Sequence, residues 1–170
     1  PTVSTTVTLA IGDAIAVALL KKRDFKINDY ALFHPGGTIG KKLLLRVGEL
    51  MHSGKSNPLV NETLPFKNVI MEMTTKGLGC ANVVDDNEKL SGIITDGDLR
   101  RLLSKEGDIL SLTAREMMKA NPKKVTPETL AVEALNLMEK FKITMLPVVN
   151  EDDLPVGLLH MHDLIRAGVV

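Results

Sequence analysis

The stretch Gly92-Ile-Ile-Thr-Asp-Gly-Asp-Leu-Arg-Arg101 occurs a second time, in altered form, as Gly157-Leu-Leu-His-Met-His-Asp-Leu-Ile-Arg166. Each copy is an apolar strand pattern followed by a polar turn, an aspartate and the start of a helix. The same offset of 65 positions relates further apolar pairs: Val60 and Val125, Met73 and Met138, and Val83-Val84 and Val148-Val149. A constant offset over about forty positions indicates an internal duplication.

Composition excludes some classes of partner. The 170 residues include 21 Lys and Arg and 21 Asp and Glu, so no bulk field attracts nucleic acid or an anionic membrane. With four Phe, one Tyr and no Trp, the chain lacks the stacking surfaces of single-strand binders. The single cysteine, Cys80, excludes an intrachain disulfide and fits a reducing compartment, so we predict a cytoplasmic protein. Its apolar neighbours predict a core thiol.

The N-terminal part predicts a helix over Thr8–Lys22 that is apolar nearly all round. Its apolar stretch, Leu9–Leu20, contains Gly12 and Asp13 and is too short to span a bilayer, so we expect no membrane partner. Such a helix is normally buried, yet too little chain precedes residue 47 to bury it. We therefore expect that part of its domain lies outside this sequence, which opens on Pro1, or that another subunit covers it.

Between this helix and the duplication, Asn28-Asp29 can cap a short helix over Tyr30–Phe33. His34-Pro35-Gly36-Gly37 then predicts a tight turn, because Pro35 ends the helix and the glycines allow unusual backbone angles. Thr38–Arg46 predicts a basic, Leu-rich helix.

The duplicated region is expected to begin at Val47, with two copies that each read β-α-β-β-α. The first copy predicts a short helix, a strand, a helix, two strands and a helix, at Val47–Met51, Leu59-Val60, Pro65–Thr75, Ala81–Val84, Leu90–Thr95 and Gly97–Ser104. The second copy predicts the same order at Ala114–Met118, Lys124–Thr126, Leu130–Lys142, Met145–Val149, Val156–Leu159 and Met161–Ala167. Each copy has too few strands to form a stable sheet alone, so the two copies should pack together.

Two units of this order, each ending Gly-apolar-apolar-x-x-x-Asp-Leu, resemble a cystathionine-β-synthase (CBS) domain pair. The resemblance implies an α/β (α+β) fold with pseudo-two-fold symmetry, a first domain at 47–107 and a second at 108–170. It also implies clefts between the domains that can hold adenosine-type nucleotides.

The chemistry of a nucleotide site is present in the first copy. A ribose offers two neighbouring hydroxyls, and the carboxylate of Asp98 is placed to accept both. Thr95 supplies a hydroxyl for a phosphate, and the following helix start adds unpaired N–H groups. The segment Thr144-Met145-Leu146-Pro147 matches the strand that lines the base or ribose pocket in such pairs. The second copy keeps Asp163 and has His160, which could donate to a phosphate, where the family prefers Thr or Ser.

Other interpretations of these residues stay open. Asp98 and Asp163 can simply cap helices, where a carboxylate is common and stabilising. A CBS pair can also serve only for dimerisation. His160-Met-His162 suggests a metal, but the alternate spacing with only Asp163 nearby lacks a convincing ligand set, so we expect no metal.

The first 46 residues resemble the end of a sugar isomerase (SIS) domain. The matching motifs are Pro-Thr-x-Ser-Thr-Thr, Gly-Asp-Ala-x-Ala-Val-Ala-Leu-Leu and Phe-His-Pro-Gly-Gly-x-x-Gly-Lys-Lys-Leu. With a CBS pair and the ending His-Met-His-Asp-Leu-x-Arg-Ala-Gly-Val-Val, the whole chain is similar to the bacterial D-arabinose-5-phosphate isomerases. Residues 1–46 would then be the C-terminal helices of an incomplete SIS domain.

That resemblance implies an aldose–ketose isomerase without a cofactor, which interconverts D-ribulose 5-phosphate and D-arabinose 5-phosphate for synthesis of the lipopolysaccharide sugar Kdo. The reaction needs a base of near-neutral pKa and a proton shuttle. His34 matches the family's active-site histidine, lent by a neighbouring subunit. From the residues alone, His34 instead binds the last carbonyls of a helix.

The same resemblance implies particular partners. They are a sugar-phosphate substrate, a regulatory nucleotide such as AMP, ATP or CMP-Kdo, and further copies of the chain. The copies would form a dimer through the CBS pair and a tetramer in the parent enzyme. The residues do not favour cytidine over adenosine.

Overall fold

The computed structural model describes residues 2–25, 44–104 and 108–169. The chain divides into two compact units, Pro1–Leu44 and Leu45–Val170, which are described separately here. The predicted helix over Tyr30–Phe33, the turn at His34 and residues 38–43 of the predicted helix Thr38–Arg46 lie outside the described residues. The end of that last helix is wrong, because Arg46 has an extended backbone and forms a bridge with Leu130.

In the first unit, helix α1 covers Val3–Lys22 and confirms the predicted helix, although it begins five residues earlier. Thr2 precedes the helix but its side chain makes no capping hydrogen bond; its hydroxyl bonds the Ser4 hydroxyl at 2.7 Å. Lys21 and Lys22 lie in the last turn, where cations favour the helix dipole. No side chain of α1 is buried, and Leu9 is 68% exposed.

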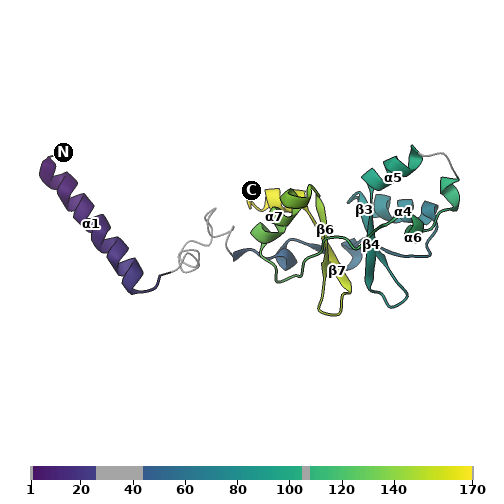
Figure 1. Cartoon of the computed structure of the whole chain (residues 1–170), viewed down its shortest axis with the longest axis horizontal. Coiled ribbons are helices and arrows are strands. Elements are labelled where there is room, and N and C mark those ends of the chain that lie inside the picture. Colours follow the sequence, from purple (N-terminus) through teal and green to yellow (C-terminus); the bar gives the residue numbers. More distant parts are fainter. Residues whose placement is uncertain (1, 26–43, 105–107, 170) are drawn as a thin grey trace. The chain divides into compact units, whose positions relative to one another are not determined.

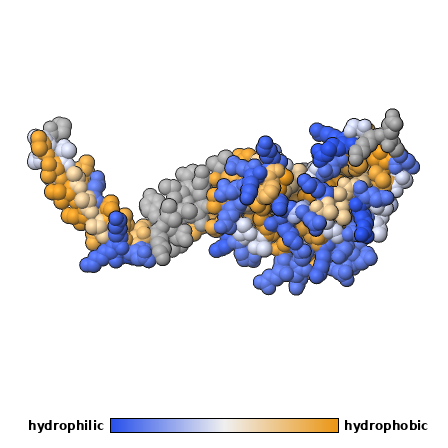
Figure 2. All heavy atoms as spheres, viewed as in Figure 1, coloured by the Kyte–Doolittle hydropathy of each residue, from blue (hydrophilic) through white to orange (hydrophobic). Residues whose placement is uncertain are grey.

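Figure 2 shows apolar side chains along α1. With 20 residues, α1 is long and apolar enough to cross a membrane, so the expectation that this segment is too short is wrong on length. Length and composition alone are weak grounds for a membrane span, because core helices of soluble proteins and signal sequences share them. Apolar side chains that no described residue covers favour a partner surface.

In the second unit, two sheets lie between helices (Figure 1). One sheet has the strand order β2-β3-β4-β5 and the other has the order β1-β7-β6. The strands are β1 His52–Ser53, β2 Leu59–Asn61, β3 Cys80–Val84, β4 Leu90–Thr95, β5 Lys119–Ala120, β6 Met145–Val149 and β7 Pro155–His160. The α-helices are α4 Phe66–Lys76, α5 Asp96–Leu103, α6 Ala114–Met117, α7 Ala131–Phe141 and α8 Met161–Arg166. Short 3-10 helices lie at Val47–Glu49, Gly54–Ser56 and Ile109–Ser111.

The duplication is visible in the strand register. Strands β3 and β4 pair antiparallel with Cys80 opposite Thr95, and β6 and β7 pair with Met145 opposite His160, at the same offset. Both ladders also shift register at equivalent places, between Val83 and Val84 in one and between Val148 and Val149 in the other. The predicted α/β pair of repeats is therefore confirmed.

The repeats exchange their leading segments. Strand β1 of the first repeat pairs with β7 of the second, and β5 of the second repeat pairs with β4 of the first. Val47 lies in the core of the second repeat, whereas Ala114 and Met117 lie in the core of the first. Each core is thus completed by residues of the other repeat, so the two repeats form one body.

This exchange explains the glycine that opens each copy of the repeated motif. A Cβ atom on Gly92 would lie 2.5 Å from the Met118 sulfur and 3.0 Å from the Lys119 carbonyl. A Cβ atom on Gly157 would lie 2.7 Å from the Met51 sulfur and 3.0 Å from the His52 carbonyl. The backbone of the exchanged segment approaches so closely that only glycine fits.

One predicted strand is wrong. Lys124–Thr126 forms a single parallel bridge, Val125 to Val148, rather than a strand. In the first repeat the Glu62 N–H bonds the Val84 carbonyl at 2.9 Å. The equivalent residue is Pro127, which has no N–H, so the second ladder cannot continue. Strands β1 and β5 were not predicted, because two residues carry no periodic signal.

Contacts between the sheets join the two repeats. Cys80 and Ile93 of the first repeat pack with Leu158 of the second. The buried Asn82 amide donates to the Asn57 side-chain oxygen at 3.1 Å, and the Asn57 amide donates to the Pro155 carbonyl at 2.9 Å. Such hydrogen bonds satisfy most of the polar groups that lie between the sheets.

Candidate functional site: a cavity between the repeats

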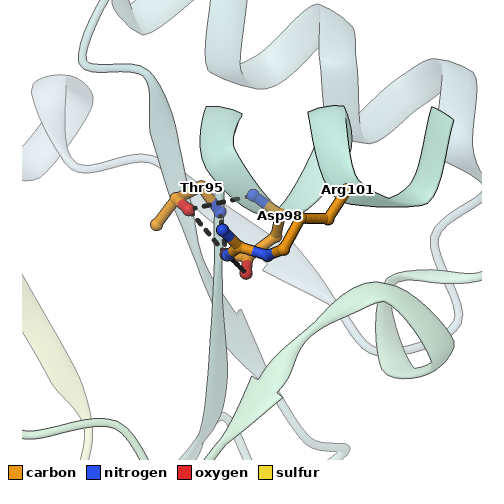
Figure 3. Close-up of polar contacts among 3 residues, drawn as sticks. All are labelled: Thr95, Asp98 and Arg101. Atoms are coloured by element: carbon orange, nitrogen blue, oxygen red, sulfur yellow. Dashed lines mark hydrogen bonds and ion pairs between the residues drawn. The ribbon is translucent and has the colours of Figure 1, made fainter. Parts of the chain in front are cut away.

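The end of β4 and the start of α5 place Thr95 and Asp98 beside each other (Figure 3). The Asp98 carboxylate accepts hydrogen bonds from the Thr95 N–H at 3.0 Å and from the Thr95 hydroxyl at 2.6 Å. In return, the Thr95 hydroxyl accepts from the Asp98 N–H at 3.3 Å. This reciprocal arrangement is a capping box. Asp98 therefore caps α5. Of the two roles considered from the sequence, helix cap and ribose contact, the cap is the one seen here.

The other Asp98 oxygen faces Arg101, whose guanidinium donates to it at 2.5 Å. The Asp98 side chain is only 16% exposed, whereas that of Arg101 is 70% exposed. Burial raises the pKa of Asp98, but hydrogen bonds from the Thr95 hydroxyl, Arg101 and the Thr95 N–H outweigh it and lower the pKa below its ordinary value. Asp98 is thus an ionised acceptor at neutral pH, and an exposed side chain covers one of its oxygens.

Beside this pair lies a cavity of about 590 Å³ that both repeats line. Its walls are Gly79, Ile93, Thr95, Asp96, Gly97, Asp98, Arg101, Lys119, Asn121, Pro122, Lys123, Phe141, Lys142, Ile143, Thr144, Met145 and Pro147. The volume is in the range of small-molecule sites.

The cavity brings together five of the predicted nucleotide-site residues: Thr95, Asp98, Thr144, Met145 and Pro147. Leu146 does not line it. Side chains alternate along β6, so Leu146 lies on the opposite face from Met145 and Pro147, fully buried in the core of the second repeat. Two of the N–H groups at the start of α5, which were predicted to be unpaired, already donate within the protein. The Asp96 N–H donates to the Gly79 carbonyl at 3.0 Å, and the Asp98 N–H donates to the Thr95 hydroxyl.

His160 and Asp163 occupy the equivalent place in the second repeat and do not line this cavity. They also form a capping box, in which the His160 N–H donates to the Asp163 carboxylate at 3.1 Å. The same carboxylate oxygen lies 3.1 Å from the His52 Nε2 atom. The capping oxygen of Asp163 is therefore shared between the His160 backbone N–H and the His52 ring.

The His160 ring takes part in the cap. Its Nδ1 atom accepts from the His162 N–H at 3.0 Å, so that nitrogen carries no proton. Burial, followed by the charges of His162 and His52, lowers the pKa of His160, while Asp163 acts in the opposite direction. Within the part of the chain that the structure describes, no three His, Cys, Asp or Glu side chains converge as metal ligands would.

Sequence reasoning missed several wall residues, above all Arg101, Lys119, Lys123, Phe141 and Lys142. The Lys123 ammonium lies 4.6 Å from the centre of the Phe141 ring, within reach of a cation–π interaction. The basic run Lys119-Ala-Asn-Pro-Lys-Lys124 was a signal for an anion site. The sequence alone does not place that run beside β4.

Cys80 lies between the sheets and is fully buried, as predicted. Burial, followed by the charge of Asp96, raises the pKa of its thiol to about 12. A thiol this protonated is a poor nucleophile at neutral pH, so Cys80 is a packing residue.

The profile of the CBS domain matches residues 47–105 and 114–170. The chain belongs to the CBS domain family. Among solved structures of this CBS-pair fold, CBSX2 in complex with AMP is 25% identical, with a TM-score of 0.62 over 74% of this chain and 96% of that one. A putative acetoin utilization protein (AcuB) from Vibrio cholerae is 24% identical, with a TM-score of 0.65 over 75% of this chain and 92% of that one.

The curated relatives that match this chain are longer than it. The arabinose 5-phosphate isomerases KdsD of Pseudomonas aeruginosa and of Escherichia coli K12 are each 51% identical over all 170 residues. The match covers 52% of each relative, so the chain spans about half their length.

Proposed function

We propose that this chain is the C-terminal regulatory part of an arabinose 5-phosphate isomerase, in which the CBS pair binds a nucleotide between its repeats. The similarity to KdsD enzymes over every residue supports the isomerase part. The observation that carries the nucleotide part is the cavity itself. It joins the ionised Asp98 and the Thr95 hydroxyl of the first repeat to Thr144, Met145 and Pro147 of the second.

Asp98 would hold the ribose. Its carboxylate can accept both hydroxyl hydrogens of the sugar once Arg101 leaves the oxygen it now covers. Arg101 is mostly exposed, so its departure disturbs little packing. The released guanidinium would then be free to pair with a phosphate.

The identity of the nucleotide is a matter for experiment. AMP is the first ligand to test, because CBSX2 has this fold and was solved in complex with AMP. CMP-Kdo is the alternative suggested by feedback on Kdo synthesis, since it carries both a ribose and a phosphate.

Isomerisation itself would take place in the preceding SIS domain, for which residues 1–46 would supply the last helices. His34 would serve as the acid or base that a neighbouring subunit lends, within a tetramer whose CBS pairs dimerise. The substrate would be D-ribulose 5-phosphate, and the protein would act in the cytoplasm. One histidine cannot supply a phosphate cradle and a second acid–base group, so residues 1–170 alone should be inactive.

The test is an isomerase assay on the full-length protein, with D-ribulose 5-phosphate as substrate, in the presence and absence of AMP, ATP, CMP or CMP-Kdo. We expect one nucleotide to change the rate, and Asp98→Asn to abolish that change without changing the basal rate. Asp163→Asn is the matched control, because it removes the same carboxylate from the other capping box. Absence of isomerase activity would refute the first part of the proposal, and a nucleotide effect untouched by Asp98→Asn would refute the second.

A second candidate is a CBS pair that serves only for assembly. The capping box favours it, since helix capping alone accounts for the position of Asp98. Under this alternative no nucleotide changes the rate, and deletion of the pair changes only the oligomeric state.

A further inference from the structure

The cavity carries a local excess of positive charge in a chain whose formal net charge is zero. Arg101 and Asp98 form an ion pair with each other. The other charged side chains of the wall are Lys119, Lys123, Lys142 and one carboxylate, Asp96. Among the described residues, none of these three lysines forms an ion pair with a carboxylate. Unpaired cations gathered in a cavity favour an anionic ligand.

The three lysines, called the lysine set below, come from separate elements of the second repeat. Lys119 lies on β5, Lys123 follows that strand, and Lys142 caps the C-terminus of α7. Lys119 pairs with Ile93, two residues before Thr95 on β4. The exchange of segments between the repeats therefore places an ammonium next to the proposed sugar and phosphate contacts.

The duplication provides an internal comparison. Asp98 and Leu99 recur in the second repeat as Asp163 and Leu164, at positions that cap and pack a helix in both copies. The lysine set does not recur. By strand register, the equivalent of Lys119 is His52, since Ile93 corresponds to Leu158. By the offset of the repeats, the equivalent of Lys142 is Gly77.

If these lysines served only the fold that both repeats share, the second repeat's counterparts in the first would also be cations. Lys124, next in sequence to Lys123, shows the ordinary alternative, because it pairs with Asp153 and does not line the cavity. Charge is therefore concentrated on the wall of one cleft and neutralised beside it.

We propose that the lysine set makes this cleft select its ligand by charge, so that it binds nucleotides that carry at least two negative charges and rejects uncharged nucleosides. The inference rests on the proposed nucleotide function and adds the class of ligand and the residues that choose it. The ribose would contact Asp98 of the first repeat while the phosphate contacts lysines of the second. One ligand would thus hold both repeats.

The test is calorimetric titration of the 170-residue chain with the pairs adenosine and AMP, and cytidine and CMP, at two salt concentrations. We expect the better monophosphate to bind at least tenfold more tightly than its nucleoside, because its phosphate gains charge-assisted hydrogen bonds that a nucleoside cannot make. Its affinity should fall as salt rises. In Lys119→Met/Lys123→Met/Lys142→Met, both the preference and the salt dependence should weaken to what Arg101 alone supplies.

Lys124→Met is the matched control, because it removes a neighbouring charge that faces away from the cavity. It should leave the preference for the monophosphate unchanged. Equal binding of nucleoside and monophosphate, or an unchanged preference in the triple variant, would overturn the charge selection and leave the nucleotide function standing. Binding of none of the four compounds would overturn the nucleotide function, and the charge selection with it.

Discussion

The two capping boxes are built from different side chains for the same task. Thr95 caps α5 with a hydroxyl, and His160 caps α8 with a ring nitrogen. A hydroxyl does this at any ordinary pH, whereas the imidazole nitrogen can accept a hydrogen bond only when it carries no proton. The second repeat is therefore tied to pH in a way that the first is not.

We predict that His160→Thr, which gives the second repeat the residue of the first, reduces the loss of stability on acidification. Burial and neighbouring charges lower the pKa of His160 in the folded chain below its ordinary value of about 6.5. The unfolded chain then binds the proton more readily, so stability is full above that value and falls as the pH drops below it. Thermal unfolding from pH 7.5 to 5 measures the effect.

His162→Gln is the control for that comparison, because its backbone N–H remains available to the His160 ring. It should keep most of the pH dependence that His160→Thr removes. Parallel curves for wild type and His160→Thr would contradict the role given to this ring.

At the scale of elements, the exchanged segments set where glycine is required. We predict that Gly92→Ala and Gly157→Ala each destabilise the chain by about 1–3 kcal/mol, as overpacking does. The methionine sulfur atoms can shift, but the carbonyl oxygens 3.0 Å away belong to paired strands and cannot. Urea unfolding of both variants measures the cost.

Gly97→Ala is the matched control, since its added Cβ would meet the Arg101 side chain at 3.5 Å and the Thr95 hydroxyl at 3.6 Å, both ordinary contact distances. It should be neutral or stabilise α5 by up to about 1 kcal/mol. If Gly92→Ala is as stable as Gly97→Ala, then the close approach of β5 to β4 is not the reason that glycine is required at position 92.

The two clefts should also differ in occupancy. Lys119, Lys123 and Lys142 line the first cleft, whereas in the second His52 takes the place of Lys119 and contacts the Asp163 carboxylate. We predict that titration with nucleotide gives about one site per chain. Two equal and independent sites would contradict this difference between the clefts.

The elements were predictable wherever a pattern is local. Strand β4 and helix α4 follow from the apolar spacing of Leu90–Thr95 and Phe66–Lys76, and the repeat offset fixes their partners in the second copy. Asp98 was predictable because the duplicated motif marks it. By contrast, Lys119 reaches the cavity, and His52 reaches Asp163, only through segments that cross between repeats. Such long-range pairing leaves no periodic trace in two-residue strands.

At the scale of the whole molecule, α1 is the described element with no buried side chain and many exposed apolar ones. Its apolar side chains are exposed on every side, which isolated helices do not tolerate well in water. We predict that residues 1–170 form dimers or larger species and that removal of residues 1–44 reduces this association without unfolding the CBS pair. Sedimentation velocity measures both, and a monodisperse monomer of the whole chain at high concentration would contradict it.

The proposed function depends most on nucleotide binding in the cavity between the repeats. The most direct measurement is thermal unfolding of the 170-residue chain with AMP, ATP, CMP, CMP-Kdo or no ligand, repeated with Asp98→Asn and with Asp163→Asn. A ligand at 100 times its dissociation constant adds about 2.7 kcal/mol, or several degrees for a chain of this size. We expect at least one nucleotide to raise the unfolding temperature of wild type and Asp163→Asn, and not that of Asp98→Asn. If no nucleotide shifts the wild type, or if the shift survives in Asp98→Asn, then Asp98 is a helix cap and the cavity is not the site.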